Sequence, residues 1–273
     1  MAKTAVVTGA SRGIGRATAI ALAHRGYDVA ITARTVHEGD AANRPEADAL
    51  PELKLVSGSL DSTAAAIEAE GRRAVPLVLD LLDRDGLQPV AEAAIAALGS
   101  VDVLVNNAIY VGPAGNNLFL DTPPDELEKR LFGNVTAQLL FTQPILRHMV
   151  GRGRGTIANV TSAAGYWKPP APPGQGGWAL SYGVSKAAVT RIAAQVLVEH
   201  GGDGIRVFSL QPGPVATERV LAAGPKLAFV ADVAAPVEVI GEVAARIVDD
   251  ERGTFRNGDT IEMQDIARIW GLL

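Results

Sequence analysis

The sequence contains no cysteine, and this absence removes several classes of function. Disulfide-stapled scaffolds, thiolate metal sites and cysteine nucleophiles all need that side chain. Histidine is scarce too: the chain has only His24, His37, His148 and His200, and no two of them stand at the spacing of metal ligands. Cysteine and histidine supply most zinc ligands, so we expect no metal site.

Basic residues and long apolar runs are also in short supply. The 25 lysines and arginines are outnumbered by 30 aspartates and glutamates, whereas nucleic-acid-binding proteins concentrate positive charge on one face. No apolar stretch reaches membrane-spanning length, and the first residues lack the apolar core of a secretory signal. We therefore expect a cytoplasmic protein that binds neither nucleic acid nor membrane.

What the chain does contain is a regular alternation of strand-like and helix-like segments. With 273 residues, 48% of them hydrophobic, it can build one large core. The alternation predicts an α/β fold in one domain covering 1–273, a Rossmann-like doubly wound parallel sheet with helices on both faces. Strands are expected at 5–8, 29–32, 74–79, 101–105, 156–160, 205–210 and 260–263. Helices are expected from the first glycine turn to 25 and at 59–70, 83–98, 123–148 and 181–199. The helix at 123–148 is expected to break at Gly133-Asn134.

A glycine-rich turn, Gly9 to Gly15, separates the first strand from the first helix. Glycines let the backbone approach a ligand closely, and a helix N-terminus offers free N–H groups to a pyrophosphate. An ordinary turn is the alternative, but the strand before it and the helix after it are the context that a dinucleotide-binding turn needs.

The end of the second strand bears on the choice of dinucleotide. In a parallel sheet the carboxyl ends of the strands line the ligand crevice, so Arg34 should lie near the adenosine ribose. A carboxylate there would favour NAD, whereas Arg34 together with Arg12 indicates a pocket for a 2′-phosphate. The alternative is a surface arginine. Asp80, after the third strand, is placed to meet the adenine amino group.

Tyr182 and Lys186 stand four residues apart at the start of a helical stretch, on one face of that helix. An isolated tyrosine has a pKa of about 10, so it transfers protons near neutrality only where a neighbouring charge favours the phenolate. The pair is also compatible with an ordinary amphipathic helix.

Together these landmarks resemble the short-chain dehydrogenase/reductase family over nearly the whole chain. Residues 8–15 resemble its T-G-x-x-x-G-x-G turn, residues 106–108 its N-N-A-G, residues 182–186 its Y-x-x-x-K, and Pro212-Gly213 its P-G. The resemblance implies a catalytic group made of Asn134, Ser162, Tyr182 and Lys186.

Each member of that group has an implied role. Tyr182 would exchange a proton with the substrate, and Ser162 would bind the substrate oxygen. Lys186 would bind the nicotinamide ribose and depress the pKa of Tyr182, and Asn134 would hold a water that links Lys186 to solvent. Val215 would help to hold the carboxamide. The full set of expected cofactor-binding residues is Gly9, Ser11, Arg12, Gly13, Ile14, Gly15, Arg34, Asp80, Leu81, Asn107, Ala108, Tyr182, Lys186, Pro212, Gly213, Val215 and Thr217.

The implied function is an NADP(H)-dependent oxidoreductase, with NADP(H) favoured over NAD(H), that interconverts a secondary alcohol and a ketone. The substrate would be a small molecule, and the assembly a homotetramer or homodimer. A catalytically silent dinucleotide-binding sensor or partner-binding protein is the alternative from another class, although all four catalytic positions are filled. Isomerisation or dehydration on the same scaffold is a further alternative, because the fold does not fix the reaction.

Two insertions, at about 35–58 and 165–178, and one substitution depart from the family pattern. Ile109 replaces the glycine of N-N-A-G, and the second insertion widens the spacing between Ser162 and Tyr182. The first insertion reads as a long loop without sustained periodicity, and loops of this length often cover functional sites.

The second insertion carries aromatic residues, and we expect them to form part of an apolar substrate pocket. The residues expected in its wall are Tyr166, Trp167, Trp178, Leu221, Leu227 and Phe229. An alternative is that the aromatic residues pack the insertion onto the body or onto a neighbouring subunit. The apolar tail, 266–273, is expected to cover a partner subunit.

Overall fold

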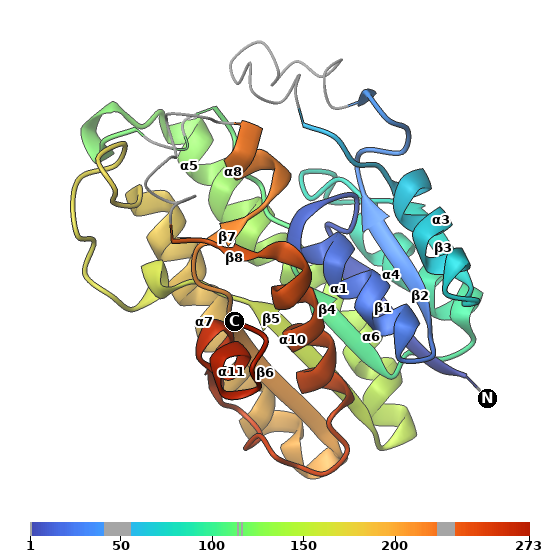
Figure 1. The fold of residues 1–273 in the computed structure, drawn as a ribbon. Coiled ribbons are helices and arrows are strands. Elements are labelled where there is room, and N and C mark those ends of the chain that lie inside the picture. The colour runs from blue at the N-terminus through green and yellow to red at the C-terminus, as the bar shows by residue number, and fades with distance from the viewer. Residues whose placement is uncertain (1, 41–55, 114, 116, 223–232) are drawn as a thin grey trace.

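The computed structural model describes residues 2–40, 56–113, 115, 117–222 and 233–273. Its centre is a seven-stranded sheet with the order β3-β2-β1-β4-β5-β6-β9, and every neighbouring pair runs parallel (Figure 1). The strands are β1 (Lys3–Thr8), β2 (Tyr27–Ala33), β3 (Ala74–Val78), β4 (Val103–Asn106), β5 (Gly155–Val160), β6 (Ile205–Gln211) and β9 (Thr260–Glu262). The short strands β7 (Val215–Ala216) and β8 (Ala235–Pro236) pair separately. The predicted doubly wound parallel sheet is confirmed.

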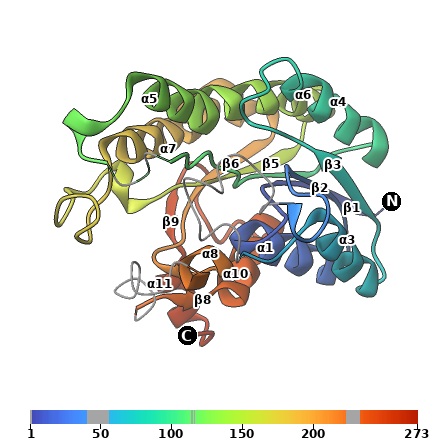
Figure 2. The same cartoon turned by 90° about the horizontal axis from the view of Figure 1, so that it is seen from above.

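Helices cover both faces of the sheet, which explains why β1, β4 and β5 are buried along almost their whole length. Figure 2 shows one layer with α1, α3, α10 and α11 and the other with α4, α5, α6 and α7. Two buried apolar clusters fill the spaces between the helices and the sheet. The helices are α1 (Gly13–His24), α3 (Leu60–Ala69), α4 (Leu87–Leu98), α5 (Pro124–Leu131), α6 (Ala137–Arg152), α7 (Leu180–His200), α8 (Glu218–Ala222), α10 (Val237–Asp249) and α11 (Met263–Ile269).

Several boundaries differ from the sequence-based expectation. Helix α4 begins at Leu87 rather than at 83, because the Asp83 carboxylate accepts the Gly86 N–H in a turn before the helix. The last strand ends at Glu262, where the unanticipated helix α11 begins. The expected break in the long helix is confirmed as a π-helical turn, Phe132–Thr136, between α5 and α6.

The strand order reverses direction between β1 and β4, and this switch point positions the site. Ligands bind in such sheets outside the carboxyl ends of the two strands that flank the reversal. Gly9 follows β1 and Asn107 follows β4, and the Asn107 side chain donates to the Thr8 carbonyl over 2.9 Å. A β-carbon on Gly9 would lie 2.8 Å from the Ala108 Cα, so only glycine allows the two turns to approach this closely.

Part of the apolar tail packs on its own chain, and the expected contact with a partner subunit stays a prediction. Ile266, Trp270 and Leu272 contact the core between the sheet and α10. The Trp270 ring meets the Phe255 ring edge-on, with centroids 6.1 Å apart. Ile269 is the main apolar side chain of α11 that stays outside, at 75% exposed.

Parts of two predicted segments fall outside the described residues. These are 41–55 of the first insertion, together with Leu227 and Phe229 of the expected pocket wall. Leu221 is described and is exposed. Within the described ranges, no helix has both the length and the apolar character needed to cross a membrane.

Candidate active site

The glycine turn forms an anion-binding cradle at the switch point. Gly13 adopts φ +58°, in the left-handed region that favours glycine. Gly15 has no room for a side chain, because a β-carbon there would collide with the Gly9 carbonyl and the Asn107 amide. No side chain caps α1 from the N-cap residue Arg12, so the first turn of α1 presents N–H groups to the crevice. This arrangement fits a dinucleotide pyrophosphate.

A carboxylate already approaches this cradle. Glu218, the first residue of α8, accepts the Gly13 N–H through Oε2 over 2.8 Å. Glu218 and its neighbour Arg219 both line the cleft, and neither was identified from the sequence. Their position directly after the P-G-P-V-A-T segment was the available signal.

Two arginines lie at the adenosine end of the cleft. Arg12 donates to the Ser57 carbonyl over 2.9 Å and to the Gly58 carbonyl over 2.6 Å. Burial lowers the pKa of Arg12, and the positive charge of Arg34 acts in the same direction, which places the two guanidinium groups near each other. Arg34 Nη1 lies 3.8 Å from Asp80 Oδ2. This end of the cleft therefore holds two guanidinium groups, with the carboxylates of Asp80, Glu38 and Glu218 nearby.

The cleft collects most of the cofactor-binding residues expected from the sequence. The members that line it are Gly9, Ser11, Arg12, Gly13, Ile14, Arg34, Asp80, Leu81, Asn107, Ala108 and Thr217. Those outside its lining are Gly15, Tyr182, Lys186, Pro212, Gly213 and Val215. Ile109, the substitution in the family pattern, also lines the cleft and is itself exposed. Its side chain therefore stands at the open side of the crevice.

Ser162, Tyr182 and Lys186 come together although the chain between the first two is long. Ser162 follows β5, and its hydroxyl lies close enough to the Tyr182 phenol to lower the pKa of that phenol. Lys186 Nζ lies 5.9 Å from the centroid of the Tyr182 ring and donates to the Val160 carbonyl over 2.7 Å. The hydroxyl, the phenol and the ammonium therefore meet at the carboxyl edge of the sheet.

Asn134 is buried in the π-helical turn beside this group. Its Oδ1 accepts the Tyr110 N–H over 2.6 Å, and its Nδ2 donates to the Ser185 hydroxyl over 3.4 Å. Ser185 precedes Lys186 on α7, so Asn134 joins the turn after β4 to the catalytic helix. Gly133 allows this packing, because a β-carbon there would lie 2.8 Å from the Tyr110 Cβ.

The electrostatics of Tyr182 differ from the sequence-based expectation. Burial raises its pKa above the ordinary value, and the groups that oppose this rise are the Ser162 hydroxyl and the positive charge of Arg130. Lys186 was expected to lower that pKa, but burial lowers the pKa of its own ammonium to about 8. Arg130 is the cation that favours the Tyr182 phenolate.

Tyr166 of the second insertion, 165–178, contacts the body of the protein. The Tyr166 hydroxyl donates to Glu262 Oε1 over 2.7 Å, and the Tyr166 and Trp167 rings meet edge-on. Trp167 is 59% exposed, and neither ring lines the cleft. For Tyr166, the structure shows the packing role that was the alternative to a pocket wall.

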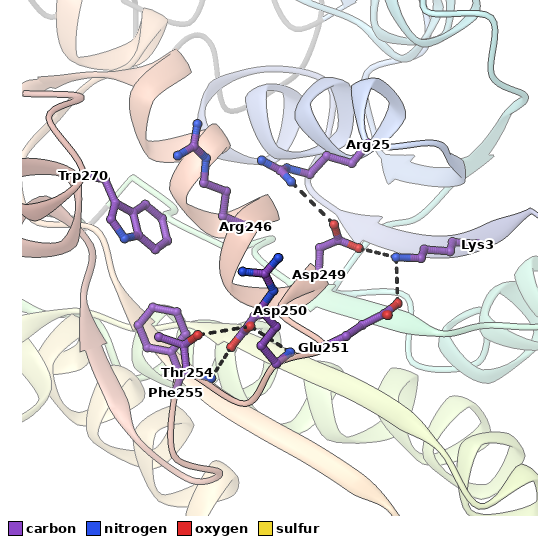
Figure 3. Close-up of a pocket in the computed structure, with 10 residues that line it drawn as sticks. Lys3, Arg25, Arg246, Asp249, Asp250, Glu251, Thr254, Phe255 and Trp270 are labelled. Carbon is purple, nitrogen blue, oxygen red and sulfur yellow. Dashed lines mark hydrogen bonds and ion pairs between the residues drawn. The ribbon is translucent and has the colours of Figure 1, made fainter.

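A second hollow, of about 430 Å³, lies at the opposite edge of the sheet. Figure 3 shows that Lys3 and Arg25 point toward the carboxylates of Asp249 and Glu251. Lys3 Nζ lies 2.8 Å from both Asp249 and Glu251, and Arg246 stacks over the Trp270 ring at 5.4 Å. These charged side chains are engaged with one another or with an aromatic ring, so this hollow is the weaker candidate for a ligand site.

No cluster of three or more metal-ligating side chains occurs in the part of the chain that the structure describes. The candidate site offers a hydroxyl, a phenol and an ammonium group beside the cleft.

Comparisons with known proteins agree with this geometry. The family model for short chain dehydrogenases matches residues 3–53 and 53–227 of this chain. A short chain dehydrogenase of Pseudocercospora fijiensis is 33% identical over 218 residues, which cover 79% of this chain and 60% of the fungal protein. The chain thus spans less than two thirds of that relative.

Two further proteins extend the comparison. Gluconate 5-dehydrogenase of Gluconobacter oxydans is 32% identical over 214 residues, covering 78% of this chain and 72% of the relative. A short chain dehydrogenase from Mycobacterium paratuberculosis, solved bound to NAD, superposes with a TM-score of 0.74 at 27% identity and 95% coverage of both chains. The chain therefore belongs to the short-chain dehydrogenase family, as an oxidoreductase that uses a nicotinamide dinucleotide.

Proposed function

We propose that the protein is an NADP(H)-dependent oxidoreductase that interconverts a secondary alcohol and a ketone. The observation that carries this proposal is the meeting of Ser162, Tyr182 and Lys186 at the edge of the sheet where the dinucleotide cleft opens. Hydroxyl donors at such a point stabilise the negative charge that develops on a carbonyl oxygen during reduction.

Each residue has a specific role in this proposal. The bound dinucleotide supplies or accepts the hydride. The Ser162 hydroxyl binds the substrate oxygen, and the Tyr182 phenol donates the proton to it during reduction and accepts that proton during oxidation. Lys186 binds the nicotinamide ribose, and Asn134 holds the catalytic helix against the turn after β4. Val215 and Thr217 support the carboxamide end.

We propose NADP(H) as the preferred dinucleotide because two arginines lie at the adenosine end. Arg12 and Arg34 are close enough for their charges to interact, and a 2′-phosphate would compensate both. The NAD bound to the mycobacterial relative belongs to that protein and leaves this preference open to test.

The decisive experiment compares binding and turnover. NADPH and NADH are titrated into the wild type, Arg34→Ala and the control Arg154→Ala, whose exposed guanidinium lies at the other edge of the sheet. We expect Arg34→Ala to weaken NADPH binding by about 10- to 100-fold, the range for a lost charge-assisted hydrogen bond, with NADH unchanged. Equal binding of both dinucleotides by the wild type would overturn the preference for NADP(H).

Turnover tests the reaction itself. NADPH oxidation is followed with a panel of ketones for the wild type and for Tyr182→Phe, which removes only the phenolic oxygen. Loss of the proton donor is expected to lower kcat by about 10²- to 10⁴-fold while NADPH affinity stays within error. Dinucleotide binding without turnover of any ketone would favour the silent sensor instead.

The remaining expectations belong to the same proposal. We propose a cytoplasmic homodimer or homotetramer, which light scattering of the purified protein tests. The expected apolar pocket wall stays a prediction for Trp178, and Leu227 and Phe229 lie outside the described residues.

A further inference from the structure

A buried arginine lies close to the proposed proton donor. Arg130, near the end of α5, is 4% exposed, and α5 packs against α7, the helix that carries Tyr182. A β-carbon placed on Gly115 would lie 3.4 Å from Arg130 Nη2 and 3.4 Å from Val111 Cγ1. Val111 lines the cleft, so the guanidinium lies close to the cleft.

No hydrogen bond or ion pair engages this guanidinium among the described residues. The nearby carboxylate of Glu126 is already committed, since Oε2 accepts the Tyr110 hydroxyl over 3.0 Å and Oε1 lies 2.9 Å from Lys129 Nζ. Some buried polar atoms of the protein are fully enclosed and have no hydrogen-bond partner, but the Arg130 nitrogens are not among them. They therefore retain access to solvent-filled space in spite of the burial of the side chain.

An arginine in this position requires an explanation. Guanidinium groups stay charged at all accessible pH values, and buried charges in proteins are normally paired. Burial disfavours the charged form of Arg130, which shows that the protein does not fully compensate it. A ligand that brings one negative charge beside Tyr182 would supply the missing partner.

We propose that Arg130 binds a carboxylate of the substrate, so that the alcohol or ketone acted on by Tyr182 belongs to a hydroxy acid or keto acid. The planar guanidinium matches a carboxylate in a two-point hydrogen bond. A phosphate monoester carries close to two charges at neutral pH, which a single arginine does not balance, so the carboxylate is the better match. This inference rests on the proposed function and specifies its substrate class.

The apolar part of the expected pocket remains compatible with this assignment, because a keto acid can carry an apolar skeleton. The competing explanation gives Arg130 only an electrostatic effect on Tyr182. These two roles predict different results, since a substrate-binding role acts on acids alone and an effect through Tyr182 acts on every substrate.

The test uses 4-oxopentanoate and its uncharged methyl ester, which share the same ketone and chain. Binding is measured by ligand-observed NMR, and turnover by NADPH oxidation, for the wild type, Arg130→Gln, Arg130→Lys and Arg147→Gln. Arg147→Gln is the control, because it removes a positive charge from an exposed position of α6. Melting temperatures of all variants establish that they are folded.

We expect the wild type to prefer the acid, and Arg130→Gln to lower kcat/KM for the acid by about 10- to 100-fold while the ester changes by less than about threefold. Arg130→Lys should recover part of the loss, because it keeps the charge without the planar fork. Arg147→Gln should match the wild type.

Other outcomes overturn the inference. Equal preference for acid and ester in the wild type would do so, as would an equal loss on both substrates in Arg130→Gln. Turnover of the ester with no binding of the acid would remove the carboxylate site and leave the oxidoreductase intact. Binding of the acid that depends on Arg130, with no NADPH oxidation, would instead support the site and reject the proposed reaction.

Discussion

The Glu218 carboxylate occupies the place where the proposed pyrophosphate would bind, and this contact predicts a gain of function by mutation. Glu218 Oε2 accepts the Gly13 N–H at the start of α1, over 2.8 Å. The partial positive charge of a helix N-terminus stabilises an anion there by about 0.3–1 kcal/mol at an exposed site. A dinucleotide must displace this carboxylate or bind beside it.

The expected magnitude follows from that geometry. Glu218 is only half-buried, so solvent screens its repulsion of a neighbouring phosphate, and we take about 1 kcal/mol for its removal. Glu218→Gln keeps an oxygen that can accept the Gly13 N–H but removes the charge. Dinucleotide affinity should rise about fivefold, since 1.4 kcal/mol corresponds to tenfold.

The assay is calorimetric titration with NADPH, NADH and adenosine 2′-monophosphate. The two dinucleotides carry a pyrophosphate and should both gain affinity, whereas the mononucleotide should not. Glu92→Gln, an exposed change on α4, is the control for net charge. High salt should shrink the gain. Unchanged or weaker dinucleotide binding by Glu218→Gln, relative to this control, would refute the reasoning.

Two further predictions concern stability. Burial lowers the folded-state pKa of Lys186 from 10.5 to about 8, so the stability of the folded state falls as pH drops from 10.5 to 8 and stays low below that. Lys186→Met should therefore raise the free energy of unfolding at pH 7 by about 2 kcal/mol, after about 1 kcal/mol is subtracted for the lost bond to Val160. The difference in the free energy of unfolding between Lys186→Met and the wild type should become smaller toward pH 10. Urea unfolding that gives the same difference at pH 7 and at pH 10 would contradict this prediction. Gly15→Ala should destabilise the protein by about 1–3 kcal/mol and weaken dinucleotide binding, because the new β-carbon meets the Gly9 carbonyl. Gly151→Ala on α6, where a β-carbon meets nothing, is its control, and equal melting temperatures for the two variants would show that the turn tolerates a side chain.

The sequence alone determined the architecture and most of the dinucleotide cleft. Strand and helix periodicities are local, and their alternation leads to a doubly wound sheet whose carboxyl edge is fixed by topology. The glycine turn, Arg34 and Asp80 each follow a strand, so their meeting in one cleft was predictable. The spacing of Tyr182 and Lys186 placed both on one helix face for the same reason.

Only the tertiary structure decided which charges face these residues. Glu218 meets Gly13 across 205 positions of the chain, and Arg130 reaches Tyr182 from a different helix. Ile266, Trp270 and Leu272 of the tail pack against their own core, a contact that the apolar pattern of the tail did not predict. Periodicity states which face of a segment is apolar, but the partner of a side chain depends on how separate segments pack. The sequence therefore predicted the cleft, and the fold alone revealed Glu218 and Arg130 within reach of it.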